Sequence, residues 1–136
     1  MIIISVDLGK ARTGLAISDK TGFLASPLMM IEEKSPQKIL EKVSQAVASN
    51  KAELVVVGLP KNMDGSEGDS AKSAREFTDR LSELSGIKTI MQDERGTTIT
   101  AHGYLSARDV KGKKRKAQVD QVAAAIILQD YLDSNR

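Results

Sequence analysis

The chain has 136 residues, about one domain, and 40% of them are hydrophobic, which suffices for one core of ordinary size. It contains no cysteine and one histidine, which excludes disulfides, thiolate metal sites and histidine-rich metal sites. The formal net charge is only +2, the N-terminal apolar run is too short for a signal peptide, and no stretch approaches the ~20 apolar residues of a membrane span. We therefore expect a cytoplasmic protein with a single domain over residues 1–136.

The first third of the chain predicts three strands. Residues 2–6, 13–18 and about 23–31 are short apolar segments separated by turns that carry glycine. Three sequential strands with tight turns indicate an antiparallel meander. Pro27 in the third segment indicates an edge position or a bulge, because proline cannot donate a hydrogen bond to a neighbouring strand.

The rest of the chain alternates helices with strands. Ser35-Pro36 predicts a helix start, with serine as the N-cap and proline at the first helical position. Further helices are predicted at about 69–85, 97–107 and 117–132, and further strands at 53–58 and 87–91. The order β-β-β-α-β-α-β-α-α predicts an α/β fold, with a mixed five-stranded sheet that is flanked by helices.

A dense basic run precedes the last predicted helix, and we expect it to lie on a loop over residues 108–116. Such a run is typical of a phosphate-binding patch, and a solvated surface loop is the alternative. Its candidate substrate-binding residues are Lys113, Lys114, Arg115 and Lys116.

Three carboxylates occupy positions where an acid is unexpected. Asp7 follows the first apolar strand directly, where burying a charge is costly. Glu94 follows the last strand, and strand alternation would turn its neighbour Asp93 to the opposite side. Asp120 lies in the first turn of the last helix, and its neighbours three, four and seven residues on are all apolar, which places it on or beside the packed face.

The three acids should meet at one edge of the sheet. Carboxyl ends of parallel strands and helix N-termini gather there, so we expect Asp7, Glu94 and Asp120 to converge. Converging carboxylates repel one another unless a cation lies between them. With oxygen ligands, that cation would be Mg²⁺ or Mn²⁺, and two such ions can promote phosphodiester hydrolysis. The prediction is a catalytic, metal-holding triad in which Asp7 bridges the metals.

The sequence also resembles a known family, the pre-16S rRNA nucleases, which are also described as Holliday-junction-resolvase-like proteins of ribonuclease H-like fold. The similar segments are DLGKARTGLAISD (7–19), VVGLPKNMDGSEG (56–68), DERGTT (93–98) and VDQVAAAIILQDYL (119–132), in that order. The resemblance places the family's acids on Asp7, Glu94 and Asp120. It implies maturation of the 5′ end of 16S rRNA in the bacterial cytoplasm. Gly96 and Thr13 depart from the family pattern, and neither is a proposed ligand.

Four other residues are candidates for substrate binding. Arg12 lies between two turn-prone glycines, and a plain surface arginine is the alternative. Lys61 and Asn62 lie on the loop after a buried strand, where ligand loops are common, although a simple turn would also suit them. Arg95 could pair with a phosphate or with its neighbour Asp93. Aromatic residues make up only 3% of the chain, so recognition should depend on backbone charge and weaken with salt.

The leading hypothesis is metal-dependent phosphodiester hydrolysis in a structured rRNA precursor, by a monomer or weak homodimer. A four-way DNA junction resolvase is one alternative, and it would act as a dimer because two strands are cut symmetrically. A phosphotransferase of the actin-like superfamily is another, since DLGKARTG resembles its phosphate loop, although that fold needs two lobes. The third is a non-catalytic RNA-binding ribosome-assembly factor, which would tolerate loss of the three acids.

Overall fold

The computed structural model describes residues 1–9, 12–60, 68–93 and 112–135, with the backbone alone for residues 112–121. Five strands form one sheet in the order β3-β2-β1-β4-β5. The antiparallel meander consists of β1 (Ile3–Leu8), β2 (Thr13–Ser18) and β3 (Ala25–Ile31). β4 (Leu54–Leu59) is parallel to β1, and β5 (Lys88–Asp93) is parallel to β4. The predicted mixed five-stranded sheet is confirmed.

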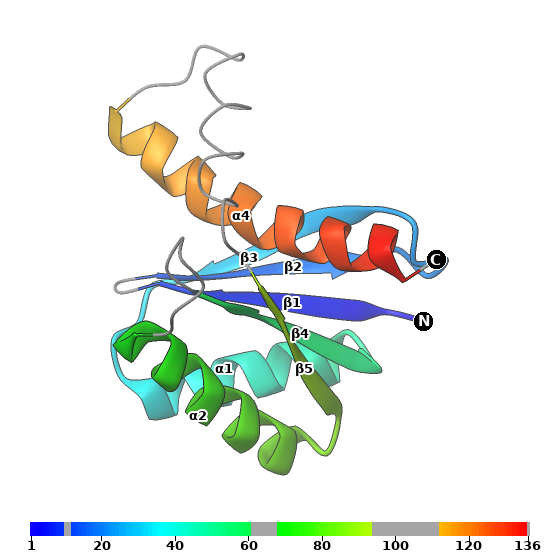
Figure 1. The fold of residues 1–136 in the computed structure, drawn as a ribbon, viewed down its shortest axis with the longest axis horizontal. Coiled ribbons are helices and arrows are strands. Elements are labelled where there is room, and N and C mark those ends of the chain that lie inside the picture. Colours follow the sequence, from blue (N-terminus) through cyan, green and yellow to red (C-terminus); the bar gives the residue numbers. More distant parts are fainter. Residues whose placement is uncertain (10–11, 61–67, 94–111, 136) are drawn as a thin grey trace.

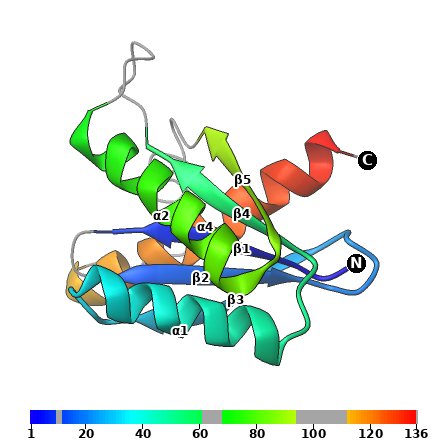
Figure 2. The same cartoon turned by 90° about the horizontal axis from the view of Figure 1, so that it is seen from below.

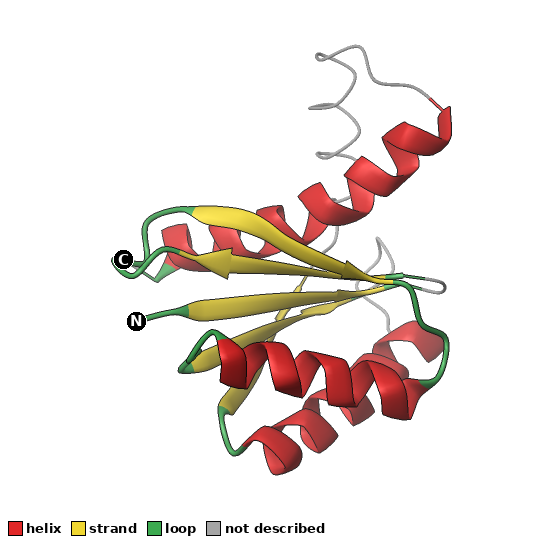
Figure 3. Cartoon of the chain, turned by 180° about the vertical axis from the view of Figure 1, so that it is seen from behind, coloured by secondary structure: helices red, strands yellow, loops and turns green. Residues whose placement is uncertain are grey.

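Helices cover both faces of the sheet. α1 (Pro36–Ser49) and α2 (Asp69–Ser85) lie on one face, and α4 (Gly112–Ser134) crosses the other (Figures 1 and 2). The two chain termini lie at the same end of the sheet, opposite the turn between β1 and β2 (Figure 3). No helix in the described ranges is long and apolar enough to cross a membrane.

Strand alternation divides the core into two layers. In β1, Ile4 and Val6 pack with α1 and α2, while Ile3 packs with Leu128 and Leu132 of α4. β1 and β4 are therefore covered on both faces, as expected for strands packed between helices, although β1 carries Ser5 and Asp7 among its apolar residues. This two-sided burial explains why their sequences are continuous apolar runs rather than alternating ones.

Local signals in the sequence have the predicted structural outcomes. The hydroxyl of Ser35 caps α1 by accepting a hydrogen bond from the backbone N–H of Lys38 at 3.4 Å. Gly86 ends α2 with a left-handed φ of 69°, which glycine adopts without steric cost. Pro27 lies on the edge strand β3, and the β2–β3 register shifts next to it, between Leu15 and Ala16. The edge position and the bulge that this proline predicted are both present.

Three predicted boundaries near the proposed site are wrong. β5 ends at Asp93 rather than at residue 91, so Asp93 belongs to the strand. α4 begins at Gly112 rather than near residue 117, so residues 112–116 of the expected basic loop are helical. Lysine and arginine are good helix formers, and a dense charge does not by itself end a helix. β1 extends to Leu8, so Asp7 lies within the strand rather than after it. The helix predicted at 97–107 lies outside the described residues.

Candidate active site

Asp7 lies near the carboxyl end of the central strand β1 and is half-buried. Alternate residues of a strand share a face, so Asp7 belongs with Ile3 and Ser5. Ile3 packs against α4, and the Ser5 hydroxyl donates a 2.7 Å hydrogen bond to the carbonyl oxygen of Ala124 in that helix. Asp7 therefore lies on the α4 face of the sheet.

The strands on both sides of Asp7 carry glycine at the adjoining position. Gly14 of β2 is the register partner of Asp7. On the other side Val6 pairs with Val57, so Gly58 is the next residue of β4 along the same register. Both glycines are buried. Neither glycine adds a side chain to the α4 face next to Asp7, and glycines in strands often mark a close approach of a ligand or of another backbone.

The turn after β1 depends on another glycine. The N–H of Gly9 donates to the carbonyl oxygen of Arg12 at 2.9 Å, which closes the turn from β1 into β2. A Cβ at position 9 would overlap that same carbonyl oxygen, so no larger residue fits without a backbone shift. This tight turn holds Arg12 close to the strand end that carries Asp7.

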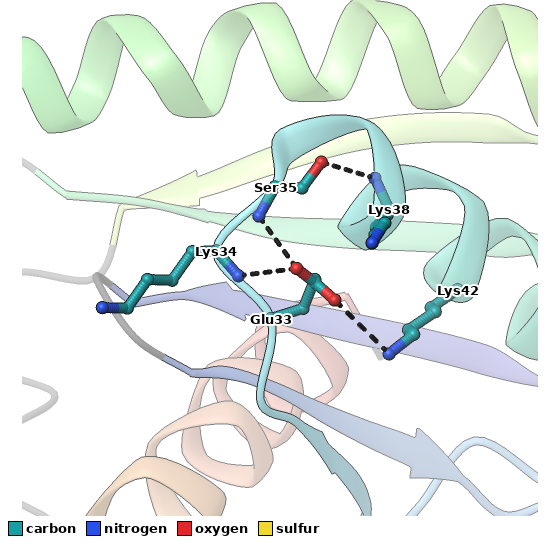
Figure 4. Close-up of polar contacts among 5 residues, drawn as sticks. All are labelled: Glu33, Lys34, Ser35, Lys38 and Lys42. Carbon is teal, nitrogen blue, oxygen red and sulfur yellow. Dashed lines mark hydrogen bonds and ion pairs between the residues drawn. The ribbon is translucent and has the colours of Figure 1, made fainter.

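Arg12 lines a surface cavity of about 480 Å³ together with Glu32, Glu33 and Lys34. The Glu33 carboxylate is already engaged within the chain (Figure 4): it accepts hydrogen bonds from the N–H groups of Ser35 and Lys34 and forms a 3.9 Å ion pair with Lys42. The Ser35 N–H is the main cause that lowers the pKa of Glu33, with the nearby lysines adding to the effect. The cavity thus combines two cationic side chains, Arg12 and Lys34, with two acidic ones, of which Glu33 is already engaged by hydrogen bonds and an ion pair.

β5 ends at Asp93, one residue before Glu94, the second predicted acid. Its last residue, Asp93, is exposed and is the register partner of Leu59. Ile90 packs in the α4 layer, so Gln92 shares the α4 face by alternation, whereas Asp93 belongs to the other face. Four predicted site residues, Lys61, Asn62, Glu94 and Arg95, lie outside the described residues.

The backbone of Asp120 lies in α4, about one helical turn before Ala124. Ala123, Ala124 and Ile127, which follow position 120 by three, four and seven residues, are all buried. The position of Asp120 on or beside the packed face stays a prediction. The basic residues Lys113 to Lys116 occupy the first turns of α4. For these basic residues and for Asp120 the structure describes the backbone alone.

Within the described residues, no group of three or more histidine, cysteine, aspartate or glutamate side chains could hold a metal ion. Of the predicted triad, only the Asp7 side chain is described, so the convergence of the three acids stays a prediction. Sequence reasoning missed Gly58 and Ser5. The only signal for Gly58 was a glycine that interrupts the apolar run of β4 near its end, and Ser5 had none beyond a hydroxyl among apolar residues.

Comparison with known proteins identifies relatives of the whole chain. The profile of the family described as "RuvX: Holliday junction resolvase" matches residues 1–134. A protein named "Putative pre-16S rRNA nuclease" in Chloroflexus aurantiacus is 42% identical, over 99% of this chain and 88% of the relative. The protein of the same name in Halothermothrix orenii is also 42% identical, over 98% of this chain and 95% of the relative.

Solved structures share the fold. Thermus thermophilus RuvC in complex with Holliday junction substrate superposes with a TM-score of 0.63 at 14% identity, covering 98% of this chain and 94% of that one. The fowlpox virus resolvase with substrate Holliday junction DNA gives 0.60 at 16% identity, covering 98% of both chains. At these identities the likeness concerns the fold alone, and it confirms the expected ribonuclease H-like architecture.

Proposed function

Since the chain belongs to the RuvX family, we propose that it is a nuclease that hydrolyses phosphodiester bonds in the 5′ leader of pre-16S rRNA with the help of a divalent cation. The observation that carries the proposal is the placement of Asp7: a half-buried carboxylate on the α4 face, between two strand glycines, at the edge where β1, β4 and β5 all end. Relatives 42% identical over nearly the full chain carry the nuclease name.

Two further positions support a triad of Asp7, Glu94 and Asp120. Residues 88, 90 and 92 of β5 share the α4 face, so a strand continued by one residue past Asp93 would turn Glu94, not Asp93, to the side of Asp7. The backbone of Asp120 lies one turn before Ala124, the helix residue bonded to β1, and the residues three, four and seven positions after Asp120 are buried. Both arguments select the acids that the family resemblance selects.

The available donors suit a hard cation. The chain has no cysteine and one histidine, so carboxylate oxygens are the ligands it can offer, and Mg²⁺ and Mn²⁺ prefer such ligands. Asp7, Glu94 and Asp120 would hold one or two such metal ions. When bound, a divalent cation activates water and stabilises the charge on the leaving oxygen. The contribution of the chain is to fix the carboxylates on rigid elements and to keep glycines on either side of Asp7.

Basic residues around this edge would bind the phosphate backbone. Arg12 is held beside the end of β1 by the Gly9 turn. The basic run at the start of α4 supplies four more cations. Contacts of this type position nucleic acid without reading its sequence. Lys61, Asn62 and Arg95, which follow β4 and β5 closely in the sequence, complete the proposed substrate-binding set.

The substrate class rests on the names of the relatives. Processing of an rRNA precursor would place the protein in the cytoplasm, acting as a monomer or weak homodimer. A four-way DNA junction is the second candidate substrate, and the family description favours it.

The experiment that tests the proposal offers both substrates to the same protein. A labelled pre-16S 5′-leader RNA and a labelled four-way DNA junction are incubated separately with Mn²⁺, with Mg²⁺ and with chelator. We expect metal-dependent cutting of the RNA. If the protein cuts only the junction, and has a dimeric mass when the junction is present, junction resolution would replace rRNA processing as the proposed function. If it cuts neither substrate, the proposal that it is a nuclease would fail and a non-catalytic binding factor would be favoured.

A further inference from the structure

Ser5 is a fully buried polar residue in the middle of the central strand, and the proposed function has not used it. Its register partners are Ala16 of β2 and Val56 of β4, which are also fully buried. The hydroxyl therefore lies in an apolar layer between sheet and helix. There it donates a 2.7 Å hydrogen bond to the carbonyl oxygen of Ala124, which joins β1 directly to α4.

Stability explains this serine poorly. Burying a hydroxyl costs free energy that one hydrogen bond only roughly offsets. The acceptor is a carbonyl in a helix interior, which already accepts the N–H four residues later and gains little from a second donor. An alanine at position 5 would keep the packing without a hydroxyl. What the hydrogen bond adds is a directional link in the middle of β1, where the surrounding contacts are between apolar groups. The Gln129 amide of α4 makes further polar links to the sheet, with the N–H of Ala25 and the carbonyl oxygen of Phe23. These links lie at or just before β3 and not at the strand that carries Asp7.

The bond fixes how far along β1 the helix lies. α4 is antiparallel to β1, since Leu132 lies beside Ile3 in one cavity wall and Ala124 meets Ser5. From Ser5 to Asp7 the strand advances about 6.6 Å. From Ala124 back to Asp120 the helix advances about 6 Å in the same direction. Residues two apart on a strand and four apart on a helix share a face, so the bond brings positions 7 and 120 abreast.

We propose that Ser5 is a positioning residue, which holds β1 and α4 in the register at which Asp7 and Asp120 bind the same divalent cation. The inference rests on the proposed function, because it takes both carboxylates as ligands. Ser5 contacts neither cation nor substrate. It acts through the strand that carries one acid and the helix that carries the other.

The test is a titration of the full chain with Mn²⁺ in the absence of RNA, followed by the electron paramagnetic resonance signal of the free ion. Ser5→Ala is expected to weaken Mn²⁺ affinity about tenfold, as loss of an orienting group around a metal site typically does. Ser18→Ala is the matched control. Ser18 is a buried serine on the same face of the sheet, but its hydroxyl accepts a 2.8 Å hydrogen bond from the N–H of Ile3 in β1 and makes no link to α4.

Unchanged Mn²⁺ affinity in folded Ser5→Ala protein would overturn the proposal, and so would equal weakening by both serine variants, which would indicate general loosening. If thermal unfolding shows that the alanine variant is not folded, Ser5→Cys replaces it, since a thiol has similar size but donates weakly. Its affinity must fall as well. Asp7→Asn in the same titration separates the two proposals. Normal Mn²⁺ binding by Asp7→Asn would contradict the proposed metal site itself. Weakened Mn²⁺ binding by Asp7→Asn, together with normal binding by Ser5→Ala, would contradict only the positioning role.

Discussion

A carboxylate within the central strand of a sheet needs compensation for the water that it loses. Half-buried Asp7 loses more of its hydration than Asp93, the other acid at a strand end, which is exposed at the edge of the sheet. The glycines at positions 14 and 58 add no side chain on either side of Asp7. At the residue scale this combination is costly for an apolar core and useful for holding a cation.

The adjacent acids Asp93 and Glu94 provide a prediction at this scale. We expect Glu94→Gln to lower the Mn²⁺-dependent cleavage rate at least about 100-fold, because it removes a proposed ligand on the side of Asp7. Asp93→Asn should leave the rate close to wild type, because alternation places Asp93 on the other face of the sheet. Initial rates on the leader RNA compare the two. Inactivation by Asp93→Asn with normal activity of Glu94→Gln would reverse the assignment.

At the scale of elements, α4 carries its basic residues at an unfavourable end. Cations in the first turns of a helix are repelled by the positive end of the helix dipole. The helix dipole therefore does not favour Lys113 to Lys116 at this end, whereas the proposed binding of a polyanion would use them there. The same helix has acidic residues near its other end, Asp130 and Asp133, so its charge is strongly uneven along its length.

The basic start of α4 leads to a prediction about salt. The double variant Lys114→Gln/Lys116→Gln should weaken RNA binding and reduce the slope of log K against log salt by about 1 for each phosphate that the variant no longer neutralises. Lys88→Gln is the control, because Lys88 is exposed at the start of β5, the opposite end of the parallel strands. Fluorescence anisotropy at several salt concentrations measures both. A slope unchanged in the double variant, or equally reduced in the control, would contradict a specific phosphate-binding role.

The acidic end of α4 leads to a prediction about pH. Burial, reinforced by the charge of Asp133, raises the pKa of Asp130 above its ordinary value of 3.8. A raised folded-state pKa stabilises the protein below the ordinary value, and this contribution is lost as pH rises through the raised value. Asp130→Asn should therefore raise the Tm at neutral pH, and the gain should vanish at acid pH.

Asp19 is the control, because its pKa is shifted in the opposite direction and its substitution should change the Tm with the opposite sign. Hydrogen bonds from Thr21 and from the N–H of Phe23 are the main causes that lower its pKa, so it stabilises the protein above the ordinary value and loses this contribution as pH falls through the lowered one. Asp19→Asn should lower the Tm at neutral pH. Thermal melts of both variants across pH check the pair, and shifts of the same sign at neutral pH would contradict the assignment.

Sequence patterns predicted most elements because each depended on local chemistry. Ser35-Pro36 and Gly86 act within one turn of the chain, and the apolar run at 54–59 reports burial directly. The start of α4 was missed because charge density and helix propensity conflict in residues 112–116, and the sequence does not say which prevails. Gly58 and Ser5 were missed because their significance comes from register with other strands and with α4, which only tertiary pairing determines.

At the scale of the whole molecule, topology brings the site together. β1, β4 and β5 are parallel, so their carboxyl ends and the residues that follow them lie at one edge of the sheet, while both termini lie at the other (Figure 3). The basic start of α4 lies toward the same edge as the end of β1 (Figure 1). Among the described residues, Asp7, Arg12 and the backbone of the basic start of α4 thus lie toward one edge, although they come from segments far apart in the sequence.

The most direct measurement is cleavage of labelled pre-16S 5′-leader RNA with Mn²⁺ by wild-type and Asp7→Asn protein at matched concentrations, with RNA binding measured in parallel. The substitution keeps the size of the side chain and removes its charge. We predict that wild-type protein cuts the RNA only in the presence of the metal, and that Asp7→Asn binds the RNA equally well without cutting it. Equal cutting by both proteins, or cutting by wild type in chelator, would contradict a metal-dependent site built on Asp7.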